Sequence, residues 1–169
     1  MNSSAAQPLQ PGVIVIDTRE QLPLEFSAEW RTIRAKLPTG DYSLAGFHTM
    51  QKPGIIIERK SLSDLVRSIT VDHDREMRKI ERMKPFRFKG FVIEASYGEI
   101  ERHEYESAAS PQSVIQALAA IQVRHNVHIA WGGTRDGCAR DVQSWFRQFA
   151  RGVLKDHAAL MKSWEGNEK

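Results

Sequence analysis

The stretch GIIIERKSLSDL, from Gly54 to Leu65, limits the possible folds of this chain more than any other feature. Its three consecutive isoleucines, Ile55–Ile57, are typical of a buried strand, and the run continues directly into Glu58, Arg59 and Lys60. Because side chains alternate along a strand, Glu58 and Lys60 share one face and Arg59 points to the other. A rigid strand that begins in the core therefore ends with an acid and two bases.

Further strands and helices are predicted on both sides of this one. The other strands are expected at VIVID (13–17), less regularly at 30–37, and at DYSLA (41–45), GFVIEA (90–95) and VHIAW (127–131). Turn signals at Pro38–Gly40 and Pro53–Gly54 predict tight, antiparallel connections among the early strands. Helices are expected after the Ser61–Asp64 capping pattern, from Asp72 or Asp74 to about Pro85, from Ser110, and from about 136 to beyond 154, with a loop or short helix at 97–109. This order predicts an α/β fold, a mixed central β-sheet flanked by α-helices in a single domain.

Length and composition exclude several other classes of protein. The 169 residues suit one compact domain, and no apolar run approaches the ~20 residues of a membrane span. Cys138 is the single cysteine, which excludes a disulfide framework and a zinc cluster of cysteines and favours a reducing interior compartment, cytoplasmic or nuclear. We expect a flexible leader at 1–11, one domain at 12–160 and a flexible tail at 161–169.

A segment rich in basic residues begins in the helix predicted from Asp72 or Asp74. The net charge is only +3, but basic residues are concentrated between Asp74 and Arg102. Those expected to reach DNA are Arg75, Arg78, Lys79 and Arg82. On one face of a helix, such side chains would neutralise phosphates. The alternative is an ordinary solvated face, since Glu76 and Glu81 lie among them at pairing distances.

Acidic residues occur at the ends of several predicted strands. Asp17 and Glu20 follow the first strand, Asp41 follows a turn, and Glu58 ends the isoleucine strand. If Asp17, Asp41 and Glu58 converge, their repulsion requires a cation, and hard carboxylate oxygens suit Mg²⁺ or Mn²⁺. Lys60 would then hold a water or stabilise charge on a phosphodiester. Each residue also has a structural explanation alone, as a turn residue, a helix cap (Asp64) or half of a surface ion pair.

Several of these segments together resemble the nuclease domain of the XPF family of structure-specific endonucleases. The family signature of Gly-Asp, a spacer, Glu-Arg-Lys, three residues and Asp occurs as Gly40-Asp41 and Glu58-Arg59-Lys60 to Asp64. The preceding Asp-x-Arg-Glu is also present, from Asp17 to Glu20. The resemblance covers roughly Val13 to Glu94. It implies a restriction-endonuclease-like fold and Mg²⁺-dependent cleavage of branched or partly single-stranded DNA, with Mn²⁺ expected to substitute, in repair or recombination.

The resemblance also implies roles for individual residues. Asp17, Glu20, Asp41, Glu58 and Lys60 become the catalytic set, with Asp17, Asp41 and Glu58 as metal ligands. Arg19, Arg59 and Asp64 become supporting residues, and Arg59 is also a candidate DNA contact. Relatives in the family carry helix-hairpin-helix modules that this chain does not show after Trp164. Junction recognition is therefore expected to come from a partner or from self-association, or else the specificity is looser.

Two questions stay open at this level. Relatives dimerise through helices, and the last helix carries an apolar stripe that includes Trp145, Phe146 and Phe149. The stripe predicts either a homodimer interface or a helix that covers its own core. The domain itself is expected to be an active nuclease, with a catalytically silent DNA-binding scaffold, or a nuclease on linear duplex DNA, as the alternatives.

Overall fold

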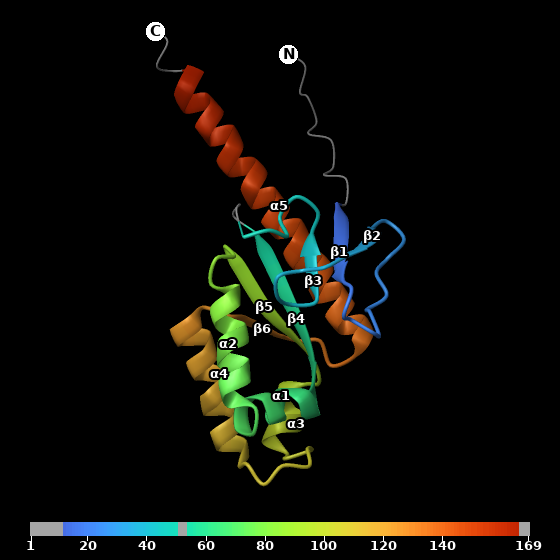
Figure 1. The fold of residues 1–169 in the computed structure, drawn as a ribbon, viewed down its shortest axis with the longest axis vertical. Helices are drawn as coiled ribbons and strands as arrows, with labels where there is room; N and C mark the ends of the chain where they lie inside the picture. The colour runs from blue at the N-terminus through green and yellow to red at the C-terminus, as the bar shows by residue number, and fades with distance from the viewer. Residues whose placement is uncertain (1–11, 51–53, 166–169) are drawn as a thin grey trace.

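A mixed six-stranded sheet forms the centre of the molecule, with strand order β2-β1-β3-β4-β5-β6. The computed structural model describes residues 12–50 and 54–165 (Figure 1). The strands are β1 (Val13–Asp17), β2 (Arg31–Ala35), β3 (Tyr42–Leu44), β4 (Ile55–Ser61), β5 (Phe88–Glu94) and β6 (His128–Trp131). The helices are α1 (Leu62–Thr70), α2 (His73–Met83), α3 (Tyr97–Glu101), α4 (Pro111–His125) and α5 (Arg135–Glu165). The predicted α/β class with a mixed, helix-flanked sheet is confirmed.

Strand directions decide where the charged strand ends lie. β3 pairs antiparallel with both β1 and β4, as predicted for the early strands, while β4–β5, β5–β6 and β1–β2 are parallel. Consequently β1, β4 and β5 run in one direction and β3 in the other. The carboxyl ends of β1, β4 and β5 and the amino end of β3 therefore lie at one edge of the sheet. We call this the acidic edge, since Asp17, Asp41, Glu58 and Glu94 lie along it.

The two faces of the sheet carry separate apolar cores, and β4 contributes to both. Ile56 packs with Phe91, Ile93 and side chains of α1, α2 and α4. Ile55 and Ile57 pack on the opposite face with α5. The alternation continues past the isoleucines, so Glu58 and Lys60 point toward the α1–α2 face and Arg59 toward the α5 face.

Gly40 fixes the turn that leads into β3. Its φ is +70°, in the left-handed region that favours glycine, and a Cβ there would lie 2.6 Å from the Ile56 side chain. Any larger residue at this position would displace the turn from β4. Gly40 therefore brings the next residue, Asp41, directly against the charged end of β4.

Helix α5 covers one face of the sheet and continues beyond it (Figure 1). Phe146 is fully buried, Trp145 packs edge-on against Phe88, and Phe149 packs edge-on against Phe47. The predicted use of these aromatics as a dimer interface is therefore wrong for Phe146, and all three cover the core of their own domain. Residues 161–165, predicted as part of a flexible tail, are helical; 1–11 and 166–169 lie outside the described residues.

Within the described ranges, no helix combines the length and the apolar character that crossing a bilayer requires.

Candidate active site

The acidic edge brings together residues that are far apart in the sequence. The Asp41 N–H donates to the Ile57 carbonyl at 2.8 Å, and the Asp17 N–H donates to the Asp41 carbonyl at 2.8 Å. These backbone bonds place the ends of β1 and β4 on either side of Asp41. Three segments that are distant in the sequence, at the ends of β1 and β4 and the start of β3, therefore meet at one place.

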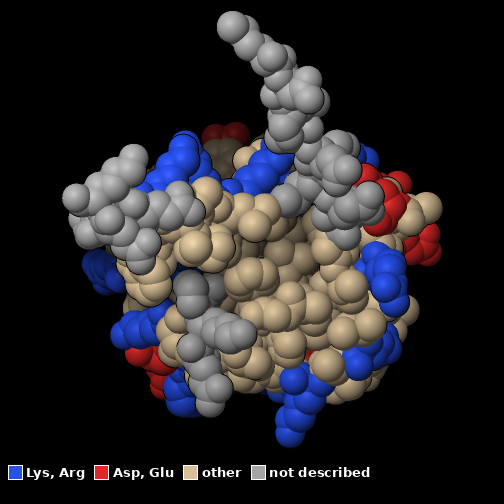
Figure 2. All heavy atoms as spheres, turned by 90° about the horizontal axis from the view of Figure 1, so that it is seen from above, with Lys and Arg blue, Asp and Glu red and all other residues tan. Residues whose placement is uncertain are grey.

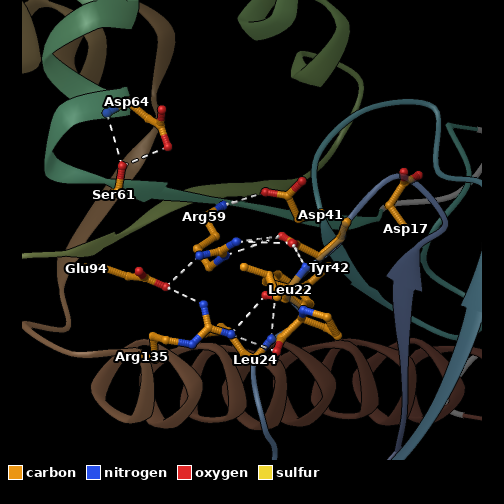
Figure 3. A network of polar contacts seen from close by, with 12 residues as sticks. Asp17, Leu22, Leu24, Asp41, Tyr42, Arg59, Ser61, Asp64, Glu94 and Arg135 are labelled. Carbon is orange, nitrogen blue, oxygen red and sulfur yellow. Dashed lines mark hydrogen bonds and ion pairs between the residues drawn. The ribbon is translucent and has the colours of Figure 1, made fainter.

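Asp17 lies at this edge, but its carboxylate is already occupied. It accepts hydrogen bonds from the Arg19 backbone and side chain at 2.8 and 2.6 Å and from the Leu37 N–H at 2.6 Å. Burial raises the pKa of this carboxyl, but the hydrogen bonds from Arg19 and Leu37 outweigh it and hold the pKa below its ordinary value. In Figure 3 the carboxylate lies apart from Asp41. Asp17 therefore fixes the loop after β1.

On the α5 face, Arg59 is held between two glutamates, one of which, Glu94, is labelled in Figure 3. Its guanidinium contacts Glu20 at 3.1 Å and Glu94 at 2.7 Å. Arg135, at the start of α5, pairs with the same Glu94 at 3.3 Å and donates to the carbonyls of Leu22 and Pro23 at 2.9 Å. This network ties the Glu20 loop to α5.

The environment of the Asp41 carboxylate disfavours its charge. Its Oδ2 accepts the Arg59 N–H at 2.7 Å. Burial, and then the nearby Glu58 charge, raise the pKa of Asp41 to about 7. A carboxyl in this environment gains stability from either a proton or a cation.

On the α1–α2 face, two ion pairs connect β4 to α2. Lys60 Nζ donates to Glu76 Oε2 at 3.0 Å and lies 3.8 Å from Glu58, while the ammonium of Lys79 contacts Glu58. Lys60 also lies over the Phe91 ring, 5.4 Å from its centroid. The side chains of Lys60 and Glu76 are only 5% and 4% exposed, and Glu76 Oε1 has no hydrogen-bond partner among the described residues. α2 is therefore part of the site.

These ion pairs separate residues that the sequence predicted as one cluster. Glu20 and Arg59 lie on the α5 face, while Glu58 and Lys60 face α2. Asp64 is exposed at the start of α1, where its N–H donates to the hydroxyl of the capping residue Ser61 at 3.1 Å and its carboxylate accepts the same hydroxyl at 2.7 Å. From the sequence, Glu76 is predicted only to pair with basic residues on a solvated helix face. Its spacing of three from Lys79 is the signal that could have placed both on one face of α2.

The basic residues predicted on one face of α2 have two different environments. Arg75, Arg78 and Arg82 are exposed, and Arg75 lines a polar pocket of about 430 Å³ together with Glu58, Lys60 and Glu76. Lys79 points into this pocket and pairs with Glu58. Three of the four predicted basic residues are therefore available to a phosphate backbone.

The site offers few carboxylate oxygens that could bind a divalent metal ion. Across 12–50 and 54–165, no three His, Cys, Asp or Glu side chains form a group that could hold a metal ion. Asp41 and Glu58 remain as a pair of adjacent carboxylates, and Mg²⁺ is usually bound by one or two carboxylates together with water and substrate phosphate. The unfavourable charge of Asp41 fits a cation at this pair.

The buried Asp41 carboxyl has a testable effect on stability. An unfolded aspartate has a pKa of about 3.9, whereas the folded protein holds a proton on Asp41 up to about pH 7. This proton stabilises the folded state fully below about pH 4, and its contribution is lost as the pH rises to about 7. We expect the melting temperature of the protein in EDTA to fall between pH 5 and 8, and Asp41→Asn to flatten that fall. An equally steep decline in both proteins would contradict this.

Comparison with known proteins agrees with this architecture. The ERCC4 domain family model matches residues 16–140. XPF from Aeropyrum pernix has 22% identity and a TM-score of 0.64, with 89% of this chain and 73% of that chain covered. A structure of XPF from Aeropyrum pernix in complex with DNA has 21% identity and a TM-score of 0.61, with 84% and 66% covered. A comparison with curated proteins finds no match.

The fold is that of a restriction-endonuclease-like nuclease domain. The edge of its sheet carries Asp17, Asp41, Glu58 and Lys60. The chain belongs to the ERCC4 domain family, and the resemblance to the XPF nuclease domain is confirmed.

Proposed function

We propose that this protein is a divalent-metal-dependent DNA endonuclease that cleaves branched or partly single-stranded DNA. The observation that carries the proposal is that Asp41, Glu58 and Lys60 lie together at one end of β4. The negative charge of Asp41 is unfavourable there, because the carboxyl is buried next to Glu58. Such a pair of carboxylates beside an amine suits the hydrolysis of a phosphodiester. Membership of a family of nucleases supports the same reaction.

In this proposal, Asp41 and Glu58 hold Mg²⁺ or Mn²⁺, and Asp17 holds the β1 loop in place. The metal, when bound, neutralises charge on the scissile phosphate. Lys60, anchored by Glu76, directs its remaining N–H groups toward the attacking water and the phosphoryl oxygen. Attack of the water oxygen on phosphorus breaks the bond to the 3′ oxygen. The products are a 5′-phosphate and a 3′-hydroxyl.

The exposed arginines of α2 give the proposed enzyme its contact with DNA. Arg75, Arg78 and Arg82 lie on the helix that also carries Glu76 and Lys79. Phosphate contacts made by these arginines would position the duplex without reading its sequence. A preference for junctions then follows from DNA shape, which agrees with the structure-specific cleavage of the family.

A cleavage panel tests the function. End-labelled flap, fork, bubble, Holliday, linear duplex and single-stranded DNA are incubated with the protein and either Mg²⁺, Mn²⁺ or EDTA. We expect metal-dependent cuts near the single-strand/double-strand boundary of the flap, fork or bubble. Cleavage of linear duplex alone would favour the alternative substrate. Binding of all substrates without cleavage under either metal would indicate a scaffold and contradict the enzyme.

We also propose that two copies of the domain associate through the distal part of α5, where it continues beyond the sheet. Large apolar side chains are exposed there, with Trp164 66% and Leu160 52% accessible, and Met161 beside them. Figure 2 shows the same end of the molecule, where uncharged side chains fill the centre and Lys and Arg lie mostly around it. Light scattering at micromolar concentrations is expected to give the mass of a dimer and, for Leu160→Glu/Trp164→Glu, that of a monomer. A monomer for the unaltered protein would contradict this.

A further inference from the structure

Lys79 occupies a position in the site that its predicted role as a surface DNA contact does not explain. Its ammonium contacts Glu58 Oε1, and its side chain is 25% exposed. Burial lowers the pKa of Lys79, but the charge and hydrogen bond of Glu58 and the nearby Glu76 and Asp41 charges raise it above its ordinary value. Lys79 therefore brings a firm positive charge to the proposed metal ligands.

The other basic side chains at the ends of β4 and α5 already have acidic partners. Arg59 and Arg135 neutralise Glu20 and Glu94, and Lys60 is hydrogen-bonded to Glu76. Glu58 is in direct contact with Lys79, while Lys60 lies 3.8 Å from Glu58 and is held by Glu76. Asp41 has no ion-pair partner among the described residues. A divalent cation between Asp41 and Glu58 would place three positive charges against these two carboxylates if Lys79 stayed. Like charges at such short range repel strongly in a partly buried site.

We propose that Lys79 is a displaceable counter-ion, which competes with the divalent cation for Glu58 and moves to a DNA phosphate when both ligands bind. This inference rests on the proposed function. The flexible stem of lysine allows the ammonium to move while α2 stays in place. The polar pocket into which Lys79 points is also lined by Arg67, which pairs with Asp72 at 3.0 Å, and by Arg75. Arg75 makes no ion pair among the described residues, so the pocket offers a phosphate both room and an available guanidinium. The metal-free protein is thereby kept in a state of low metal affinity, and DNA and metal bind cooperatively.

Manganese binding without DNA tests the competition directly. The free Mn²⁺ signal in electron paramagnetic resonance is titrated with the unaltered protein, with Lys79→Met and with Lys84→Met. Lys84 is the matched control, since it directly follows α2 but pairs with Glu81 at an exposed site. We expect Lys79→Met to bind Mn²⁺ at least about fivefold more tightly than the unaltered protein, the lower end of typical coupling between sites. Lys84→Met is expected to bind as the unaltered protein does.

The possible results separate this inference from the proposed function. Equal or weaker binding by Lys79→Met would overturn the counter-ion role and leave the metal site standing. No Mn²⁺ bound by any of the three proteins would overturn both. Thermal unfolding confirms that each variant folds, and Lys79→Gln replaces Lys79→Met if the latter does not. Adding a non-cleavable flap DNA is expected to tighten Mn²⁺ binding to the unaltered protein more than to the Lys79 variant, and equal tightening would also contradict the inference.

Discussion

Asp41→Asn is expected to lower the cleavage rate by at least about 10³-fold, because it removes a carboxylate at the point where charge must be neutralised during phosphodiester cleavage. The substitution keeps the shape of the side chain, and the amide oxygen can still accept the Arg59 N–H. Since burial and Glu58 disfavour the Asp41 charge, the neutral side chain should leave the fold at least as stable. Cleavage of a labelled flap is measured with saturating Mg²⁺, and folding is measured by thermal unfolding at pH 8.

Asp74→Asn is the matched control for this prediction. Asp74 is an aspartate in the first turn of α2, and its side chain is 92% exposed. It is expected to retain full activity. Substantial cleavage by homogeneous Asp41→Asn would show that Asp41 is not part of the catalytic apparatus. Loss of activity together with a lower melting temperature would instead indicate a structural role, and would contradict the expected separation of the two effects.

The strand pattern of the sequence predicted the sheet and the place of the site. Side chains alternate along β4 whatever surrounds it, so the division of Glu58 and Lys60 from Arg59 followed from the order of residues alone. The acidic residues Asp17 and Glu58 could likewise be placed at strand ends, because each directly follows a run of apolar residues. Antiparallel pairing of the early strands then explains why Asp17, Asp41 and Glu58 lie at the same edge.

The partners of these residues could not be predicted in the same way. Asp17 was expected to bind a metal, but its carboxylate accepts hydrogen bonds from Arg19 and from the Leu37 N–H. The Leu37 contact depends on how β1 packs against the segment after β2, which the local sequence does not show. Whether Phe146 faces its own core or another copy depends on where α5 crosses the sheet, which a helical stripe does not specify. The burial of Glu76 could not be predicted, because its neighbours in the sequence are those of an ordinary charged, solvated helix.

Glu76→Ala is expected to destabilise the protein by about 3–5 kcal/mol, because it leaves the buried Lys60 ammonium without its partner. Both side chains are nearly inaccessible, and Phe91 lies against Lys60. Glu58 offers partial compensation at 3.8 Å, but Lys79 already holds it. Urea or thermal unfolding measures the loss, which corresponds to a fall in melting temperature of roughly 6–20 °C for a domain of this size.

Two further variants separate the ion pair from the packing of α2. Glu81→Ala removes an exposed glutamate of the same helix, and is expected to change the stability by less than about 1 kcal/mol. The double variant Lys60→Met/Glu76→Leu replaces the buried pair with apolar side chains, and is expected to recover most of the stability lost in Glu76→Ala. It should remain inactive, because the amine is gone. If Glu76→Ala proved as stable as Glu81→Ala, the Lys60 ammonium would have found solvent or another partner, and the anchored geometry on which the proposed chemistry depends would be wrong.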